Sequence, residues 1–137
     1  MIYEMTVQVR VTDINEGQIW YQTLLNKEPD DVPHAGFAEW ELVPGCWLQV
    51  AEGVPSAGSG PIRLGVIDIE AERDRLQKEL NVESFEIHSR AEVPVKWATF
   101  TDPWGNRLGL FEYLSDTEKN ERVQTVLSKT SCSDIGG

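Results

Sequence analysis

The chain has 137 residues, 40% of them apolar, which is enough for one folded domain with a substantial buried core. Its 12 basic and 23 acidic residues give a net charge of −11, which disfavours nucleic acid and anionic membranes as partners. The acidity would attract a cationic ligand, but solubility is the favoured explanation of the charge. No apolar run approaches the roughly 18–20 residues of a membrane span, and the first residues lack the positive charge of a signal peptide. We therefore expect a cytoplasmic protein.

The first half of the chain predicts a strand, a helix and two further strands. Val7, Val9 and Val11 alternate with polar residues, which is typical of a strand with one buried face. Asp13 follows as the expected N-cap of a helix. The predicted elements are a strand over 5–11, a helix over 14–25, a turn-rich stretch over 26–36 with at most a short edge strand, and strands over 37–43 and 46–51.

The second half follows a Gly/Ser/Pro-rich linker over 53–60 and repeats this order. Its predicted elements are a strand over 62–67, a helix over 69–80 capped by Asp68, strands near 83–91 and 95–101, a turn over 102–106 and a strand over 107–112. The tail, 115–137, begins with a capping box formed by Ser115 and Glu118. We expect a helix over about 116–129 and then disorder.

An internal repeat relates the two halves, because an offset of 55 residues separates Asp13 from Asp68 and the apolar residues around them. The repeat predicts an α+β fold of two βαβββ modules, one over about 4–52 and the other over 61–114. Together they form a single domain over 1–114. Their strands are expected to form a curved, open mixed sheet around a cleft.

Three segments carry a resemblance to a known superfamily: VTDINEGQIWYQTLL (11–25), LGVIDIEAERDRLQ (64–77) and FTDPWGNRLGLFE (100–112). Over roughly residues 4–114 the chain resembles the vicinal oxygen chelate superfamily, which includes glyoxalase I, extradiol dioxygenases, fosfomycin resistance proteins and bleomycin-binding proteins. The resemblance implies a glyoxalase-like fold and a homodimer. Because that superfamily hosts several chemistries as well as pure binding, it does not fix the function.

The resemblance also implies where a divalent metal would be held, by His and Glu side chains on the cleft face of both modules. The four equivalent positions here are Thr6, Gln49, Pro61 and Gly109. Proline and glycine offer no side-chain ligand, and threonine and glutamine are weak neutral donors. We therefore expect no metal and no other cofactor. An alternative left open is a rebuilt site in which His88 joins Glu39 or Glu41.

Strand alternation assigns aromatic and charged side chains to the cleft face, which suits a flat organic molecule. The predicted ligand-binding residues are Gln8, Phe37, Glu39, Glu41, Trp47, Gln49, Arg63, Trp97 and Phe111. Some of these residues, and the neighbouring Arg10, have a structural alternative. Trp47 and Trp97 would also suit a subunit interface, and Arg10 and Arg63 would also pair with Glu39 or Glu41.

The sequence favours a metal-independent small-molecule-binding protein of the glyoxalase/bleomycin-resistance type, which binds an aromatic or cationic compound in the cleft. Whether it is an enzyme stays open. The first alternative is a metal-dependent lyase, isomerase or thiol transferase of the glyoxalase type with displaced ligands. The second is an interaction module in which the tail helix docks on a partner or across the dimer.

Overall fold

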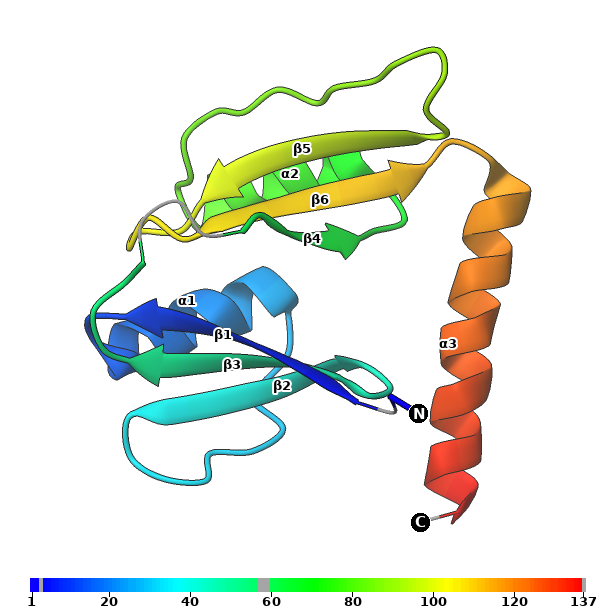
Figure 1. Ribbon diagram of the computed structural model, residues 1–137. Coiled ribbons are helices and arrows are strands. Elements are labelled where there is room, and N and C mark those ends of the chain that lie inside the picture. Colours follow the sequence, from blue (N-terminus) through cyan, green and yellow to red (C-terminus); the bar gives the residue numbers. More distant parts are fainter. Residues whose placement is uncertain (3, 57–59, 137) are drawn as a thin grey trace.

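The structure, a computed structural model, describes residues 1–2, 4–56 and 60–136, with side chains through residue 129. Its strands form two open three-stranded sheets, one from each half of the chain (Figure 1). The first sheet has the order β1-β3-β2, with β1 over Met5–Val11, β3 over Cys46–Glu52 and β2 over Phe37–Val43. The second has the order β4-β6-β5, with β4 over Ile62–Gly65, β6 over Arg107–Tyr113 and β5 over Val95–Thr101. In each sheet the central strand has one parallel and one antiparallel neighbour.

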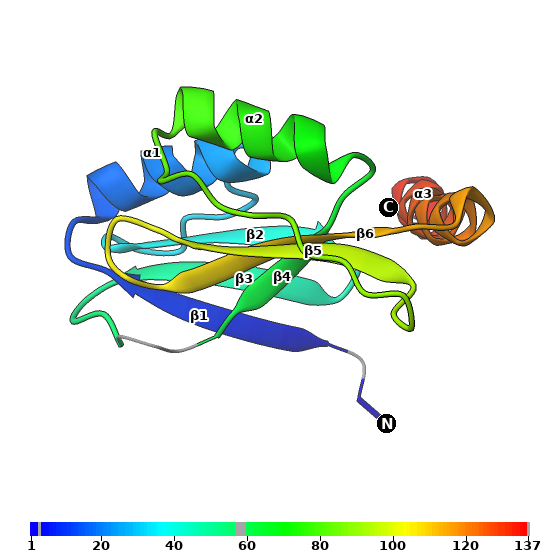
Figure 2. The same ribbon diagram turned by 90° about the horizontal axis from the view of Figure 1, so that it is seen from above.

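Two helices, α1 (Ile14–Leu25) and α2 (Ile69–Glu79), lie on the same side of the strands (Figure 2). Each sheet therefore has one face towards the helices and an outer face turned away from them. The third helix, α3 (Asp116–Gly136), stands beside the sheets (Figure 1). None of the described helices is long and apolar enough to cross a bilayer.

The observed elements confirm the predicted α+β fold with open mixed sheets, and β1, α1, β2 and β5 have the predicted bounds. The strand predicted near 83–91 is wrong, because that segment makes only one isolated bridge, between His88 and Trp97. Its alternation is real, since Phe85 and Ile87 pack against the core. An edge segment, however, has hydrogen-bonding partners on one side only, so the alternation does not guarantee a strand. The tail helix also differs from the expectation, since α3 continues past residue 129 to Gly136, where the sequence predicts disorder.

The caps of the two helices show the internal repeat at atomic level. The Asp13 carboxylate accepts hydrogen bonds from the amides of Asn15 and Glu16, and Asp68 accepts one from Ala71. Both helices are followed by an asparagine in the left-handed region, since Asn26 and Asn81 each have φ of 53°. Asparagine tolerates this conformation better than most residues, and it ends each helix, directly after α1 and one residue later, after Leu80, in α2.

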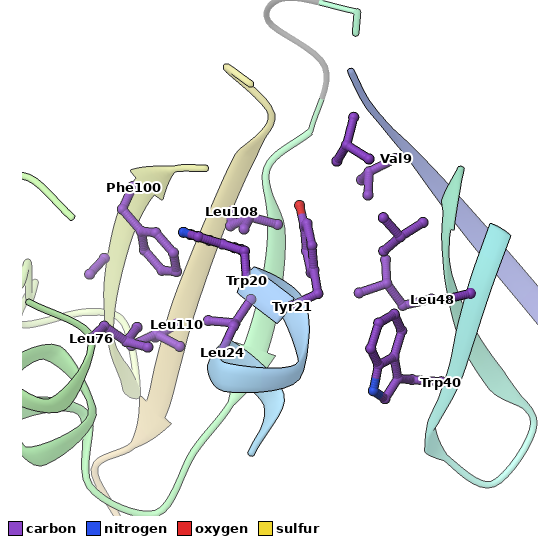
Figure 3. Packing of buried hydrophobic residues seen from close by; sticks show 14 of the residues in the cluster. Val9, Trp20, Tyr21, Leu24, Trp40, Leu48, Leu76, Phe100, Leu108 and Leu110 are labelled. Carbon is purple, nitrogen blue, oxygen red and sulfur yellow. The ribbon is translucent and has the colours of Figure 1, made fainter. Parts of the chain in front are cut away.

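The core is shared between the modules, with α1 between the two sets of strands (Figure 3). Trp20 and Leu24 lie next to Phe100, Leu108 and Leu110 of the second module. On the other side Tyr21, fully buried, packs against Trp40, with ring centroids 6.5 Å apart. Trp20 and Tyr21 therefore pack α1 against both modules.

The turn over 102–106 joins the modules through a buried carboxylate. Asp102 is 4% exposed, and its oxygens accept hydrogen bonds from the Tyr21 hydroxyl (2.6 Å), the backbone amides of Trp104 and Asn106, and the Asn106 side chain. The Trp104 indole donates to Thr12 Oγ1 at 2.9 Å and packs against the core. Trp104 therefore holds the two modules together.

Candidate functional site

A row of hydrogen-bonded polar side chains crosses the outer face of the first sheet. Gln8, Gln49 and Glu39 lie opposite one another on β1, β3 and β2. Gln8 Nε2 donates to Gln49 Oε1 at 3.3 Å, and Gln49 Nε2 donates to Glu39 Oε2 at 3.2 Å. Beyond Glu39, Asp31 continues the row through an isolated antiparallel bridge. The row therefore ends in two carboxylates, Glu39 and Asp31, of which only Glu39 is among the predicted ligand-binding residues.

An aromatic residue stands beside this polar row. Trp47, half-buried, lies between Thr6 on β1 and Glu41 on β2, as strand register requires. Glu41 is held near the β2–β3 turn, where its Oε2 accepts a hydrogen bond from the Gly45 amide at 3.2 Å. The structure thus brings together five of the first-module residues predicted to bind a ligand: Gln8, Glu39, Glu41, Trp47 and Gln49. Phe37 lies at the far end of β2, with its ring centroid 5.1 Å from that of His34.

The outer face of the second sheet carries a row of aromatic side chains. Phe111 lies opposite Trp97, and the rings of Trp97 and His88 have centroids 5.7 Å apart. Tyr113 makes an edge contact with Phe111 at 5.8 Å. Tyr113 is not among the predicted ligand-binding residues, although its position two residues after Phe111 on the same strand is the signal that places it on this face.

Arg63 and Thr99 occupy the next row of the same face, with Gly109 between them. Arg63 donates to Thr99 Oγ1 at 3.4 Å, and Arg10 donates to Gln8 Oε1 at 3.0 Å. In the part of the chain that the structure describes, neither arginine forms an ion pair. The expected charge pairs of Arg10 and Arg63 with Glu39 or Glu41 are therefore wrong, because each arginine turns to a neutral partner on its own sheet.

The four positions at which the resemblance implies metal ligands do not fit a metal ion. Gly109 and Pro61 offer no side-chain donor atom, and the Gln49 side-chain amide is already engaged on both sides. The Arg63 stem lies over Gly109, so a cation stands next to one of the positions. A divalent ion needs several oxygen, nitrogen or thiolate donors at fixed distances, and this donor set does not supply them.

One group of three carboxylates, from Asp68, Glu70 and Glu112, lies close together in the described residues. It belongs to the helix side of the second sheet, because Glu112 Oε1 accepts from the Ile69 amide at the start of α2 at 2.8 Å. Lys119 donates to Glu112 at 2.6 Å, and Lys96 donates to Glu70 at 2.9 Å. Burial raises the pKa of Glu112, but the hydrogen bonds from Lys119 and the Ile69 amide outweigh it and hold the pKa below its ordinary range. The group therefore anchors α2 and α3.

The predicted ligand-binding residues are divided between the outer faces of two separate sheets. Two hollows on the surface of the described residues lie elsewhere. One is on α3, next to Arg122 and Val126, and the other lies between the start of α1 and the loop containing Val32. Neither contains any of the predicted ligand-binding residues.

No protein-family model matches the sequence, and neither does any curated protein. Among solved structures, the chain is similar to a glyoxalase/bleomycin resistance protein from Catenulispora acidiphila DSM 44928, with 31% identity and a TM-score of 0.64 over 80% of this chain and 96% of that one. It is also similar to the genomically encoded fosfomycin resistance protein FosX from Listeria monocytogenes (16% identity, TM-score 0.63, 84% and 95% covered) and to a glyoxalase-related enzyme from Clostridium phytofermentans (16%, 0.65, 82% and 96%). At this identity the last two show the fold alone.

Proposed function

The chain belongs to the glyoxalase/bleomycin resistance protein family of the vicinal oxygen chelate superfamily, and from this premise we propose that it binds a small organic molecule without a metal ion. The ligand is an aromatic or cationic compound held on the outer faces of the sheets. Catalysis is not part of the proposal, since the described side chains on these faces include no metal-ligand set.

The observation that carries this proposal is the chemistry of the four positions assigned to metal ligands by resemblance. Gly109 and Pro61 have no side-chain donor, and the Gln49 side-chain amide is used within the polar row of the first sheet. What remains on the outer faces is aromatic surface with a few orienting polar groups, which is the usual composition of a small-molecule site.

The two sheets supply complementary parts of such a site. Trp47 stands beside Glu41, and Gln49 connects the next row to the Glu39 carboxylate, so the first sheet suits an amine attached to a ring. The second sheet supplies Phe111 and Trp97 for stacking. A cationic aromatic compound would use both kinds of contact.

We further propose that the protein acts as a homodimer whose second copy helps to enclose the ligand. The support is that the predicted ligand-binding residues are divided between two separate sheets, so a second copy would be needed to cover them. A dimer is expected in light scattering during size-exclusion chromatography. A protein that is monomeric in solution and still binds the naphthalene probes described below would refute this part of the proposal.

A titration followed by tryptophan fluorescence and thermal unfolding tests the binding itself. The probes are 2-naphthylmethylamine and its neutral analogue 2-naphthylmethanol. We expect both to bind, and the double variant E39Q/E41Q to weaken the amine about tenfold while leaving the alcohol unchanged, because a hydrogen bond to a charged group contributes about 1.5–3 kcal/mol.

The matched control is the double variant E83Q/E92Q, which removes the same charge from exposed residues outside the strands. It should bind both probes like the unmodified protein. If neither probe changes the fluorescence or the melting temperature, the binding proposal is wrong. Elemental analysis of protein purified without chelators tests the metal independence, which stoichiometric nickel, zinc, manganese or iron would refute.

A further inference from the structure

The Arg63 side chain lies across a glycine. A Cβ atom added to Gly109 would stand 2.8 Å from Arg63 Cγ and 3.4 Å from its Nε, so the arginine stem occupies the space that any other residue at position 109 would fill. The same Cβ would meet the carbonyl oxygen of Ala98 at 2.5 Å. Glycine at position 109 therefore lets the guanidinium reach across β6 to Thr99 on β5.

The Arg63 guanidinium has donors to spare. Arginine carries five N–H donors, and the described contact of this one is a 3.4 Å hydrogen bond to a neutral hydroxyl, Thr99 Oγ1. Other basic residues of this acidic chain do find carboxylates, for example Arg75 with Glu72 and Glu79. Arg63 is exposed and has none within ion-pair distance among the described residues.

An aromatic surface adjoins the guanidinium on the same face. Phe111 follows Gly109 by two residues on β6, which places its ring about 6–7 Å along the strand. The ring leans over Gly65, where a Cβ would meet Phe111 Cζ at 2.9 Å, while Arg63 leans the other way over Gly109. Trp97 extends this surface on β5. A flat ring on Phe111 and Trp97 would thus have its substituent next to Arg63.

We infer that Arg63 and Thr99 form an oxyanion subsite, which binds the carboxylate or phosphate group of an aromatic ligand whose ring lies on Phe111 and Trp97. The planar guanidinium matches both groups, since it donates two parallel hydrogen bonds to either one. The inference rests on the proposed function, because it assumes that the outer faces bind a small molecule. It goes beyond that function because it predicts an anionic group on the ligand, although the protein itself has a negative net charge.

Isothermal titration of the full-length protein with four naphthalene probes tests the subsite. The probes are 2-naphthoate, 2-naphthyl phosphate, neutral 2-naphthamide and 2-naphthylmethylamine. We expect naphthoate or naphthyl phosphate to bind more tightly than the amide, and the tighter of the two identifies the oxyanion. R63Q should weaken that anion by about 10–100-fold and leave the amine within twofold, since charged hydrogen bonds contribute about 1.5–3 kcal/mol.

Three further variants separate binding from folding. R63K keeps the charge but not the paired donors, so it should recover part of the affinity, and T99V should lose less than R63Q. K78Q removes one positive charge from an exposed residue of α2 on the helix side, and it should bind every probe normally. Melting temperatures show whether each variant is folded.

The outcomes distinguish this inference from the proposed function. If the amine and amide bind but neither anion binds more tightly than the amide, or if R63Q and K78Q bind the anion equally well, the oxyanion subsite is wrong and small-molecule binding stands. If no probe binds, both proposals are wrong.

Discussion

The hydrogen bond between Tyr21 and Asp102 offers a direct measure of how strongly the two modules are coupled. Replacing Tyr21 by phenylalanine removes only a hydroxyl whose oxygen lies 2.6 Å from Asp102 Oδ2. The carboxylate keeps its donors from Trp104 and Asn106, so no buried charge is left without partners. Loss of one hydrogen bond to a charged group should lower the free energy of unfolding by about 2 kcal/mol at neutral pH.

The pH dependence of this effect is a sharper test than its size. Burial, the nearby negative charge of Asp102 and the hydrogen bond to it all raise the pKa of Tyr21 above its ordinary range. The folded state therefore keeps a proton that the unfolded chain loses at about pH 10. The stabilisation by Tyr21 is complete below about pH 10 and falls above it by about 1.4 kcal/mol per pH unit.

Urea unfolding of the unmodified protein and of Y21F, followed by tryptophan fluorescence from pH 7 to 11.5, gives the necessary curves. The stability difference should be constant up to about pH 9.5 and approach zero near pH 11.5, if it begins at about 2 kcal/mol. A difference that stays constant to pH 11.5, or one below about 0.5 kcal/mol at pH 7, would contradict the account of this contact.

Three other substitutions test further contacts. E112Q should cost about 2 kcal/mol at pH 7 in urea unfolding, and the loss should shrink steadily as the pH falls below about 4.3, because the pKa of Glu112 is lower in the folded protein than in the unfolded chain. N26A and N81A should each cost about 1–2 kcal/mol by thermal unfolding, since both residues have φ of 53°, whereas glycine at either position should cost less. R75M should cost about 1–3 kcal/mol, measured by urea unfolding, because Arg75 donates to two carbonyl oxygens near the end of α1; an unchanged midpoint would exclude that contact.

Local signals predicted most of the secondary structure. The alternation over 5–11 and the Asp13 cap predicted β1 and α1 with the bounds that the structure has, because both signals depend only on neighbouring residues. The segment over 83–91 has the same alternation but forms one bridge, at His88. Whether an alternating segment forms a ladder depends on the partner strand, which its own residues do not specify.

The sequence predicted which side chains share a face of a sheet, but not which of them contact one another. Strand alternation assigned Gln8, Glu39 and Gln49 to one face, and strand register then joined them into a row. The expected pairing of Arg63 with a glutamate failed, because Glu39 and Glu41 belong to the other sheet. Contacts within one sheet follow from alternation and register, whereas contacts between sheets depend on how the modules pack.

The net charge of −11 therefore does not determine the charge of the ligand. At physiological ionic strength the Debye length is about 8 Å, so exposed carboxylates on the helices act only weakly on the outer faces. The charged groups nearest the ligand therefore have the largest electrostatic effect on it: Glu39 and Glu41 on the first sheet, and Arg63 on the second. If both proposals hold, a ligand that spans the two sheets would carry an amine and an acid on one aromatic frame. Added salt would then weaken the contacts of both the amine and the acid. A ligand attracted only by the net charge would not depend on any particular residue of the outer faces.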